Sequence, residues 1–447
     1  MSSTPYRRIR PMFADHLGLP RSKYLPTSTL GADATHATGH CVALIAQHYD
    51  FQMTGETPSA QFETGMPDME SRFAMADVRP GWDDGVGVVT SDLWYHDALV
   101  EWMPRTILRR AIERWQAMGL EPYVGIELEA YLMEPDASAP GGFRPISTPG
   151  GFTYGVGALL DPAGVIEEIL DTADRCGLPL ESVNSEYDTP QWELTLRYTT
   201  ALRAADDAFL FKAMAQEVAH KRGFHLTFMG KPIAGKSGSG LHVNFSARTL
   251  GTAGATAKNK KSVNAFVDTK AEHGLSAVAM HAVAGLVARH ASMAAICAPT
   301  VNAYKRLKPG QLSGYWANWG LDHRSVTVRI PHQRGEGTRI EHRLGDGAAN
   351  PYLAVAAVLN AAMLGVTEKL PTPAIETGDA LSDAGTTASH TPHNLGDALD
   401  QFEADTAFNE LMGTEFTANY LAVKRDEYRK YLEHVTDWEL STYLPFH

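Results

Sequence analysis

Four segments of the chain place charged or polar side chains at every second position. They cover residues 124–133 (VGIELEAYLM), 191–198 (QWELTLRY), 241–246 (LHVNFS) and 338–344 (TRIEHRL). Because successive side chains of a β-strand point to opposite faces, each segment would, as a strand, have one polar and one apolar face. An ordinary antiparallel sheet with one solvated face produces the same alternation, so one strand alone does not decide its role. The polar faces would carry Glu127, Glu129, Glu193, His242, Asn244, Arg339, Glu341 and Arg343.

The residue types on these faces indicate a cation site. Solvated faces usually mix in Lys, Thr and Gln, whereas these faces carry almost only Glu, His and Arg. Glu127 and Glu129 share one face, where their negative charges repel each other unless a cation lies between them. Carboxylates with an imidazole suit Mg²⁺ or Mn²⁺, and guanidinium groups bind phosphate or carboxylate through paired hydrogen bonds. The residues alone therefore indicate metal-assisted phosphoryl transfer.

One segment matches the sequence pattern of a phosphate-binding loop but lacks the helix that such a loop requires. Residues 230–237 (GKPIAGKS) satisfy the P-loop pattern G-x-x-x-x-G-K-[ST]. A P-loop must open a helix, because the helix N-terminus holds the phosphates. Here Gly238, Ser239 and Gly240 follow, and then the alternating segment 241–246. We therefore reject a P-loop at this position.

The elements that must position these residues predict a mixed fold of class α+β with an antiparallel sheet. The first hundred residues predict short strands, among them 8–14 paired with 21–25 as a hairpin, and 87–94. Apolar residues then follow the helical period, and we place a domain boundary near residue 100. Residues 371–394, rich in Pro, Gly, Ser and Thr, predict a surface loop. Helices are expected over 104–119, 162–176, 201–222, 277–296, 351–364 and 416–444.

Composition excludes several classes of protein. The chain has 447 residues, with 39 basic and 52 acidic side chains and a formal net charge of −13. This balance argues against a nucleic-acid binder and against docking on anionic lipid. Three widely spaced cysteines suit a reducing compartment and form no zinc pattern. The longest apolar run, 354–366, is interrupted by Asn360, so we expect no membrane span and a cytoplasmic location.

From about residue 91 to the C-terminus the chain resembles the glutamine synthetase superfamily. The resemblance implies an N-terminal β-grasp domain over residues 1–100. It also implies a catalytic domain over 101–447, with a curved antiparallel sheet flanked by helices. It rests on the order and spacing of GIELEAY (125–131), ESVNSEYDTPQWEL (181–194), GKPIAGKSGSGLHVNFS (230–246), NAYKRLKPG (302–310), HRSVTVRIP (323–331), RIEHRLGDGAANPYLA (339–354) and VTDWELSTYL (435–444).

The resemblance implies an ATP-dependent ligase. ATP would phosphorylate the γ-carboxylate of glutamate, and ammonia or an amine would attack the γ-glutamyl phosphate. Two Mg²⁺ or Mn²⁺ ions per site are implied, each held by three side chains. The ligands on the glutamate side would be Glu129, Glu186 and Glu193, and those on the ATP side would be Glu127, His242 and Glu341.

The same resemblance implies roles for the arginines. Arg306 and Arg343 would bind the carboxylate groups of glutamate, and Arg343 would also lie near the transferred phosphoryl group. Gly238, in the loop 237–240, would bring its backbone close to glutamate. The residues that would contact the ATP phosphates are Arg324, Arg329, Arg339 and Asn244, and the catalytic pair would be Arg324 and Arg343. Members of the family form hexameric rings, single or stacked in pairs, with active sites between subunits.

The chain departs from the family at the ammonium site. Glutamine synthetases carry an acidic residue after the Lys-Arg-Leu element, and in PGQLSGYW (309–316) Leu312 stands there. A leucine attracts no cation and accepts no proton, but it can line an apolar pocket. The Asp-Gly-Ser-Ser signature of the first domain is also missing, and Asn244 replaces the second histidine of the usual His-x-His.

These departures favour one of three hypotheses. The first is a γ-glutamylamide synthetase that joins glutamate to a small organic amine. The second is a glutamine synthetase that uses ammonium despite Leu312. The third is a structural or regulatory member without activity, which should have lost metal ligands; all six candidate ligands are present.

Overall fold

The strands of the first hundred residues form two small sheets. A computed structural model describes residues 4–31, 33–55, 57–250, 262–381, 385 and 387–447. In one sheet the strand order is β2-β1-β7-β6, with β3 also paired to β1, and β1 and β7 run parallel. This sheet contains β1 (Arg8–Ala14), β2 (Pro20–Ser22), β3 (Leu25–Pro26), β6 (Arg79–Pro80) and β7 (Val86–Thr90). The other sheet contains β4 (Thr35–Cys41), β5 (Asp68–Ala74), β8 (Asp92–Tyr95) and β9 (Ala98–Leu99).

A ten-stranded sheet forms the centre of the rest of the chain. Its main path is β12-β13-β10-β16-β19-β18-β17, and the short strands β11, β14 and β15 also pair with β10. All its pairs are antiparallel except β17 with β18. The strands are β10 (Leu120–Pro135), β11 (Phe143–Pro145), β12 (Leu180–Ser185), β13 (Gln191–Leu196), β14 (Thr199–Thr200), β15 (His225–Thr227), β16 (Leu241–Thr249), β17 (Trp319–Leu321), β18 (Val328–Ile330) and β19 (Ile340–His342).

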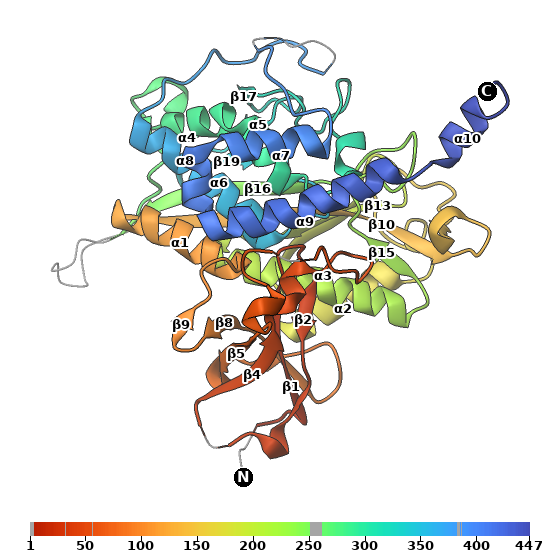
Figure 1. Ribbon diagram of the computed structural model, residues 1–447. Helices are drawn as coiled ribbons and strands as arrows, with labels where there is room; N and C mark the ends of the chain where they lie inside the picture. The colour runs from red at the N-terminus through yellow and green to blue at the C-terminus, as the bar shows by residue number, and fades with distance from the viewer. Residues whose placement is uncertain (1–3, 32, 56, 251–261, 382–384, 386) are drawn as a thin grey trace.

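Helices pack around this sheet, and the N-terminal strands lie below them in Figure 1. The apolar faces of the sheet and of the helices form one continuous core that includes Trp115, Trp192, Phe245 and Tyr352. The helices are α1 (Pro104–Ala117), α2 (Val165–Cys176), α3 (Ala201–Lys221), α4 (Ala277–Ala288), α5 (His290–Cys297), α6 (Pro351–Glu368), α7 (Leu395–Ala404), α8 (Thr406–Met412), α9 (Thr414–Glu433) and α10 (Asp437–Tyr443). The predicted α+β class, with a mostly antiparallel sheet flanked by helices, is thereby confirmed. The boundary near residue 100 stays a prediction.

Local signals explain where several helices begin. The carboxylate of Asp161 accepts hydrogen bonds from the backbone N–H groups of Val165, Ile166 and Glu167 at the start of α2, at 2.9, 2.8 and 3.1 Å. Asn350 caps α6 in the same way, and Pro351 follows at its first position. Thr436 and Glu439 form a capping box at α10.

Two of the predicted elements in the body of the fold need correction. The single strand expected over residues 87–94 is two strands, β7 and β8, in different sheets; the N–H of Ser91 between them donates to Met12 O at 2.8 Å. The helix expected over 277–296 is two helices that meet at Arg289 with a bend of 74°. The guanidinium group of Arg289 forms ion pairs with Asp405 and Glu368. The helices α7 and α8, which lie between the expected loop 371–394 and the C-terminal helix, were not predicted from the sequence.

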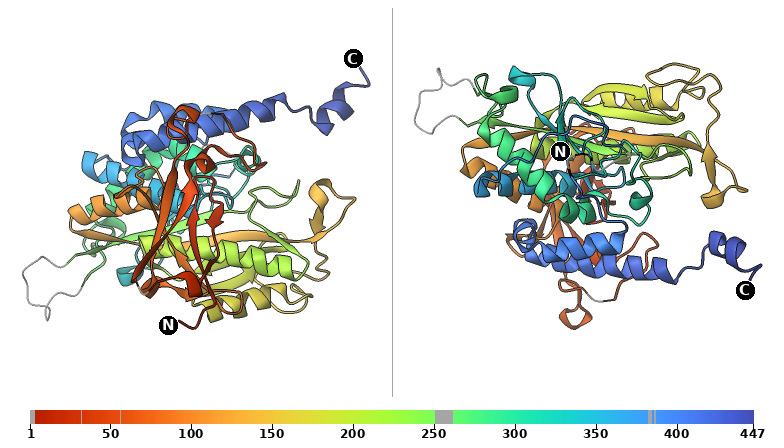
Figure 2. Two further views of the ribbon diagram at one scale, coloured as in Figure 1. Left: turned by 60° about the horizontal axis from the view of Figure 1, so that its bottom comes forward. Right: turned by 90° about the horizontal axis from the view of Figure 1, so that it is seen from above.

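The C-terminal helix is also interrupted. The expected helix 416–444 ends at Glu433 and resumes at Asp437 as α10, which projects away from the body in Figure 1 and in both views of Figure 2. The expected loop 371–394 carries, in its described residues, no helix and only an isolated bridge at His390. Helix α6 is long and apolar enough to cross a membrane, but 83% of it is buried inside the protein, as in a core helix.

Candidate active site

The register of the central sheet brings the predicted polar residues together. In the β10–β13 pair Glu129 lies opposite Glu193, and in the β10–β16 pair Glu127 lies opposite His242. In the β16–β19 pair Asn244 lies opposite Glu341. Directly opposed side chains on one face of a sheet stand about 5 Å apart at Cβ. Four strands therefore deliver these residues to one face of the sheet.

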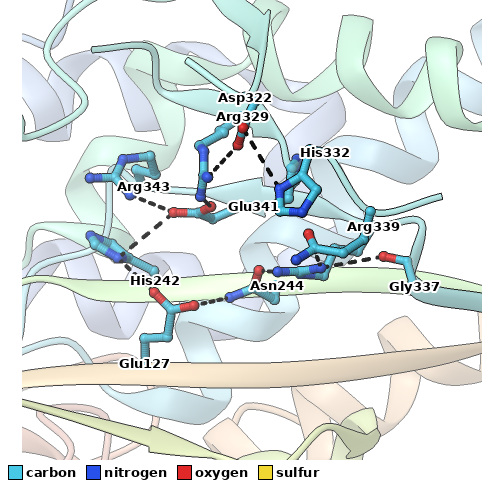
Figure 3. A network of polar contacts seen from close by, with 12 residues as sticks. Glu127, His242, Asn244, Asp322, Arg329, His332, Gly337, Arg339, Glu341 and Arg343 are labelled. Carbon is cyan, nitrogen blue, oxygen red and sulfur yellow. Dashed lines mark hydrogen bonds and ion pairs between the residues drawn. The ribbon is translucent and has the colours of Figure 1, made fainter. Parts of the chain in front are cut away.

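Glu127, His242 and Glu341 form the first cluster, which we call the histidine triad (Figure 3). One potential ligand atom from each lies within 4.8 Å of the other two. His242 Nδ1 is 3.2 Å from Glu127 Oε2 and 4.0 Å from Glu341 Oε1. His242 and Glu341 are buried, and Glu127 is partly buried. Two carboxylates and an imidazole at this spacing fit one divalent cation.

Cationic side chains already surround this triad. Arg329 Nη1 donates to Glu341 Oε2 at 2.6 Å, and Arg343 Nη1 donates to Glu341 Oε1. Burial would raise the pKa of Glu341, but Arg343, His242 and Arg329 lower it to about 2. Burial also acts to raise the pKa of Glu127, yet its hydrogen bond with His242 leaves that pKa below the usual value. Both carboxylates are therefore ionised at neutral pH and can bind a metal without losing a proton.

Glu129, Glu186 and Glu193 form the second cluster, the carboxylate triad. Their oxygens also lie within 4.8 Å of one another, and all three residues are partly buried. Burial, together with the charges of Glu127, Glu186 and Glu129, raises the pKa of Glu193 to about 8. Burial and the charge of Glu129 likewise raise the pKa of Glu186. Three carboxylates this close cannot all be charged without a cation, so the donor set fits a hard divalent ion.

A glycine-rich loop closes over the carboxylate triad. The backbone N–H of Gly240 donates to Glu129 Oε2 at 2.7 Å. A Cβ at Gly238 would lie 2.6 Å from Arg306 Cγ, and one at Gly240 would lie 2.8 Å from Arg306 Nη2 and from His242 Nε2. A Cβ at Gly238 would also lie 2.6 Å from the backbone oxygen of Gly230, so only glycine fits there and the loop backbone itself faces the site.

The other predicted arginines divide into three settings. Arg306 is buried and donates to Leu344 O at 3.2 Å and Arg343 O at 3.4 Å. Arg339 Nε donates to Asn244 Oδ1 at 2.9 Å, and Asn244 Nδ2 donates to Glu127 Oε1 at 2.8 Å. Arg324 is exposed in the turn between β17 and β18 and, among the described residues, forms no ion pair. The structure therefore brings Arg306, Arg329, Arg339 and Arg343 to the triads and leaves Arg324 apart.

A cavity opens beside the histidine triad. Its volume is about 290 Å³, and Glu127, Asn244 and Arg339 lie along one wall. Tyr123 and Tyr198 line it as well. The cavity combines aromatic surface with a guanidinium group, which suits a nucleotide base with its phosphates directed toward the triad.

Comparison with known proteins identifies the family. Residues 101–443 match the family model described as glutamine synthetase, catalytic domain. The chain belongs to the glutamine synthetase family. Glutamine synthetase of Rhizobium meliloti (strain 1021) is 34% identical over 441 residues, which are 97% of this chain and 95% of the relative. Glutamine synthetase of Pyrococcus abyssi is 35% identical over 358 residues, or 76% of this chain and 77% of the relative.

Solved structures of similar proteins include two described as GmaS. "GmaS/ADP complex-Conformation 1" is 28% identical, covers 99% of this chain and 97% of its own, and superposes with a TM-score of 0.82. "Apo GmaS without ligand" gives 28% identity and a TM-score of 0.80, with 98% and 97% coverage. As a member of the glutamine synthetase family, the protein is an enzyme of the ATP-dependent ligase type; the family uses divalent metals, glutamate, and an amine or ammonia.

The position of Leu312 bears on the amine. Leu312 is 53% exposed, and residues 308–318 contain no acidic side chain. Two residues later, a Cβ at Gly314 would lie 3.0 Å from Leu344 N, and its φ is +74°. The loop that carries Leu312 therefore passes, at Gly314, directly over the backbone of Arg343 and Leu344, and it offers no carboxylate there.

Sequence reasoning missed three residues that support the site. Gln191 is buried and donates from Nε2 to Glu129 Oε2 at 3.3 Å and to Gly238 O at 3.0 Å. Asp188 Oδ2 accepts from Ser237 N at 2.6 Å. Asp346 is buried against Gly230, and burial raises its pKa to about 6. Alternation in β13 places Gln191 on the same face as Glu193, which was the one available signal.

Proposed function

We propose that this member of the family is a glutamate–amine ligase that forms a γ-glutamylamide. The observation that carries the proposal is the exposed Leu312 on a loop without acidic residues, directly over Arg343. An ammonium ion is small and strongly hydrated, so its capture needs a carboxylate, whereas an organic amine can gain binding energy from apolar contact. The similarity to GmaS, a γ-glutamylmethylamide synthetase, supports the same conclusion.

The residues suggest how the reaction proceeds. Two divalent cations, Mg²⁺ or Mn²⁺, would neutralise charge on the transferred phosphoryl group and on the γ-carboxylate. Arg329 and Arg343 form ion pairs with Glu341, and their remaining N–H groups would donate to phosphate oxygens. Arg339 would direct the ATP phosphates along Asn244. Conversion of the carboxylate to an acyl phosphate supplies a good leaving group for attack by the amine.

Glutamate would lie between the glycine loop and the buried Arg306. Arg306 is held rigidly by two backbone carbonyls, and its remaining N–H groups can pair with a carboxylate. Gln191 fixes both Glu129 and the carbonyl of Gly238, so it would keep the loop at one distance from the carboxylate triad. We further propose that the enzyme is cytoplasmic and assembles as a ring with active sites between subunits. Arg324, together with residues from the N-terminal domain of the neighbouring subunit, would complete each site.

Ammonium is the second candidate acceptor. The curated relatives named glutamine synthetase are 34–35% identical, one of them over almost the whole chain, and this favours a glutamine synthetase. A non-catalytic role is less favoured, because both triads are complete and lie at ligand spacing.

Restoring an acid at Leu312 tests the proposal. Leu312→Glu should raise kcat/KM for ammonium relative to methylamine at least tenfold, because a carboxylate at this position attracts the small cation. Gln311→Glu is the matched control, since it adds the same charge one residue away. Phosphate release from ATP and glutamate measures both acceptors. An unchanged ratio in Leu312→Glu would contradict the account of this loop.

A further inference from the structure

A second cavity lies between the loop that follows the first N-terminal strand and the helices α3, α6 and α9. Its volume is about 450 Å³, and it is bounded by the loop 17–20, by α3 and by the start of α6. Its walls are mostly apolar and include Leu17, Leu19, Phe209, Phe228 and Pro351. A cavity of this size, with mostly apolar walls interrupted by polar side chains, is typical of sites for small molecules.

One cation faces this cavity without an acidic partner. Among the described residues that line it, only Lys212 and Glu427 carry a charge, and Glu427 is already paired with the buried ammonium group of Lys424. Lys212 Nζ donates to Gly347 O at 2.8 Å and to Ala349 O at 3.2 Å. An ammonium group has three N–H donors, so one remains for a ligand.

The ammonium group of Lys212 keeps its charge in this setting. Burial lowers its pKa to about 8, while the charge of Asp346 acts in the opposite direction. Lys212 is therefore mostly protonated at pH 7, and it forms no ion pair with Asp346 or with another described residue. Its ammonium also lies 5.1 Å from the ring centre of Phe228. A carboxylate bound in this cavity would give the charge a partner.

The cavity also touches the segments that carry the active site. Lys212 holds the carbonyls of Gly347 and Ala349, on the turn between Arg343 and α6. Asn302, another lining residue, accepts from Lys231 N at 2.7 Å and donates to Lys231 O at 3.0 Å, where the glycine-rich loop begins. A molecule bound here would contact both segments from behind, as an effector does.

We propose that this cavity is an effector site for a small apolar monocarboxylate, with the carboxylate on Lys212 and the apolar part against Phe209 and Phe228. The cavity is separate from the nucleotide-side cavity, and no residue lines both. The proposal does not depend on which amine the enzyme uses.

Calorimetry on the full-length protein tests this site, with 3-phenylpropionate as the probe and 3-phenylpropanamide as its neutral analogue. The carboxylate should bind at least tenfold more tightly than the amide. Lys212→Met, which keeps the aliphatic stem, should lose that difference, whereas Lys221→Met on the same helix should keep it. Lys221 is exposed and paired with Asp83, so it reports the loss of one surface charge.

A second variant, which fills the cavity, keeps the proposal testable if Lys212→Met does not fold. Ala213 is buried and lines the cavity, so Ala213→Phe should block the probe while Lys212 stays in place. Thermal unfolding checks that the variant is folded. Equal affinity for acid and amide in the native protein, or undiminished binding in the folded Ala213→Phe protein, would overturn the proposal.

Discussion

The two acidic triads lie side by side on one sheet but are stabilised in opposite ways. In the histidine triad, Arg329 and Arg343 form ion pairs with Glu341 and keep its pKa at about 2. In the carboxylate triad, only His242 comes within ion-pair distance among the described residues, 3.8 Å from Glu129, and the pKa of Glu193 rises to about 8. The first triad is thus neutralised by the protein, and the second requires either a proton or a metal ion.

This difference suggests that the two triads bind the charged groups of the substrates in different ways. Arg329 and Arg343 can release Glu341 and bind phosphate oxygens instead, which suits the ATP side of the site. The carboxylate triad offers no such exchange, because backbone and amide groups hold Glu129. Its cation would have to stay in place while glutamate enters and the amide leaves.

The largest expected effect comes from breaking the histidine triad. Glu341→Ala removes a candidate ligand and leaves Arg329 and Arg343 without their partner, so kcat should fall at least a thousandfold, about 4 kcal/mol of activation free energy. Glu272→Ala, at an exposed residue in the 3-10 turn before α4, is the control and should leave kcat unchanged. Phosphate release measures both variants, and more than a tenth of native activity in Glu341→Ala would exclude it as a ligand.

A second effect should separate the triads by pH. Glu193 has a folded-state pKa of about 8, above its usual value, so between about pH 5 and 8 the folded state holds a proton that the unfolded state has lost. Metal-free protein should therefore lose stability as the pH rises through this window, and Mg²⁺ or Mn²⁺ should restore it. Thermal unfolding measures the trend.

Glu193→Gln is the matched variant for this prediction, because the amide has no proton to lose. Its metal-free stability should fall less between pH 5 and 8 than that of the native protein. Its affinity for metal should be about 10–100-fold lower. Identical pH trends in both proteins would show that the carboxylate triad does not hold the proton.

The smallest effect should follow from weakening one arginine of the histidine triad. Arg329→Gln removes the guanidinium group and its ion pairs with Glu341 and Asp322, so KM for ATP should rise about tenfold while KM for glutamate changes less than twofold. Arg334→Gln is the control, since Arg334 bonds only to backbone carbonyls among the described residues. Steady-state kinetics with each substrate varied in turn gives both constants. Equal rises in the two KM values would contradict the division between the triads.

The sequence predicted those parts of the site that depend on strand alternation. Glu127, Glu129, Glu193, His242 and Glu341 lie on β10, β13, β16 and β19, where a period of two fixes the face. Glu186 lies just after β12, outside any strand, and only the resemblance to the family indicated it. Its place in the carboxylate triad depends on the loop 186–190, which no periodicity encodes.

Other features depended on tertiary contacts. The apolar pattern over 277–296 continues past Arg289, but the helix bends there, where the guanidinium group of Arg289 pairs with Asp405 and Glu368. Strand alternation likewise continues from β7 into β8, although Ser91 pairs with β1 at the change of sheet. The sequence alone does not distinguish the settings of Arg306 and Arg324. In the structure Arg306 is buried in the site, whereas Arg324 is exposed.

The most direct test of the account follows the oxygen atoms of glutamate. The proposed γ-glutamyl phosphate requires that one oxygen of the γ-carboxylate leave with the phosphate when the amine attacks. With glutamate labelled by ¹⁸O in the γ-carboxylate, ATP, Mg²⁺ and methylamine, mass spectrometry should find one ¹⁸O in each phosphate released, together with γ-glutamylmethylamide. Phosphate released without label, or with ADP but no amide, would contradict a glutamate–amine ligase.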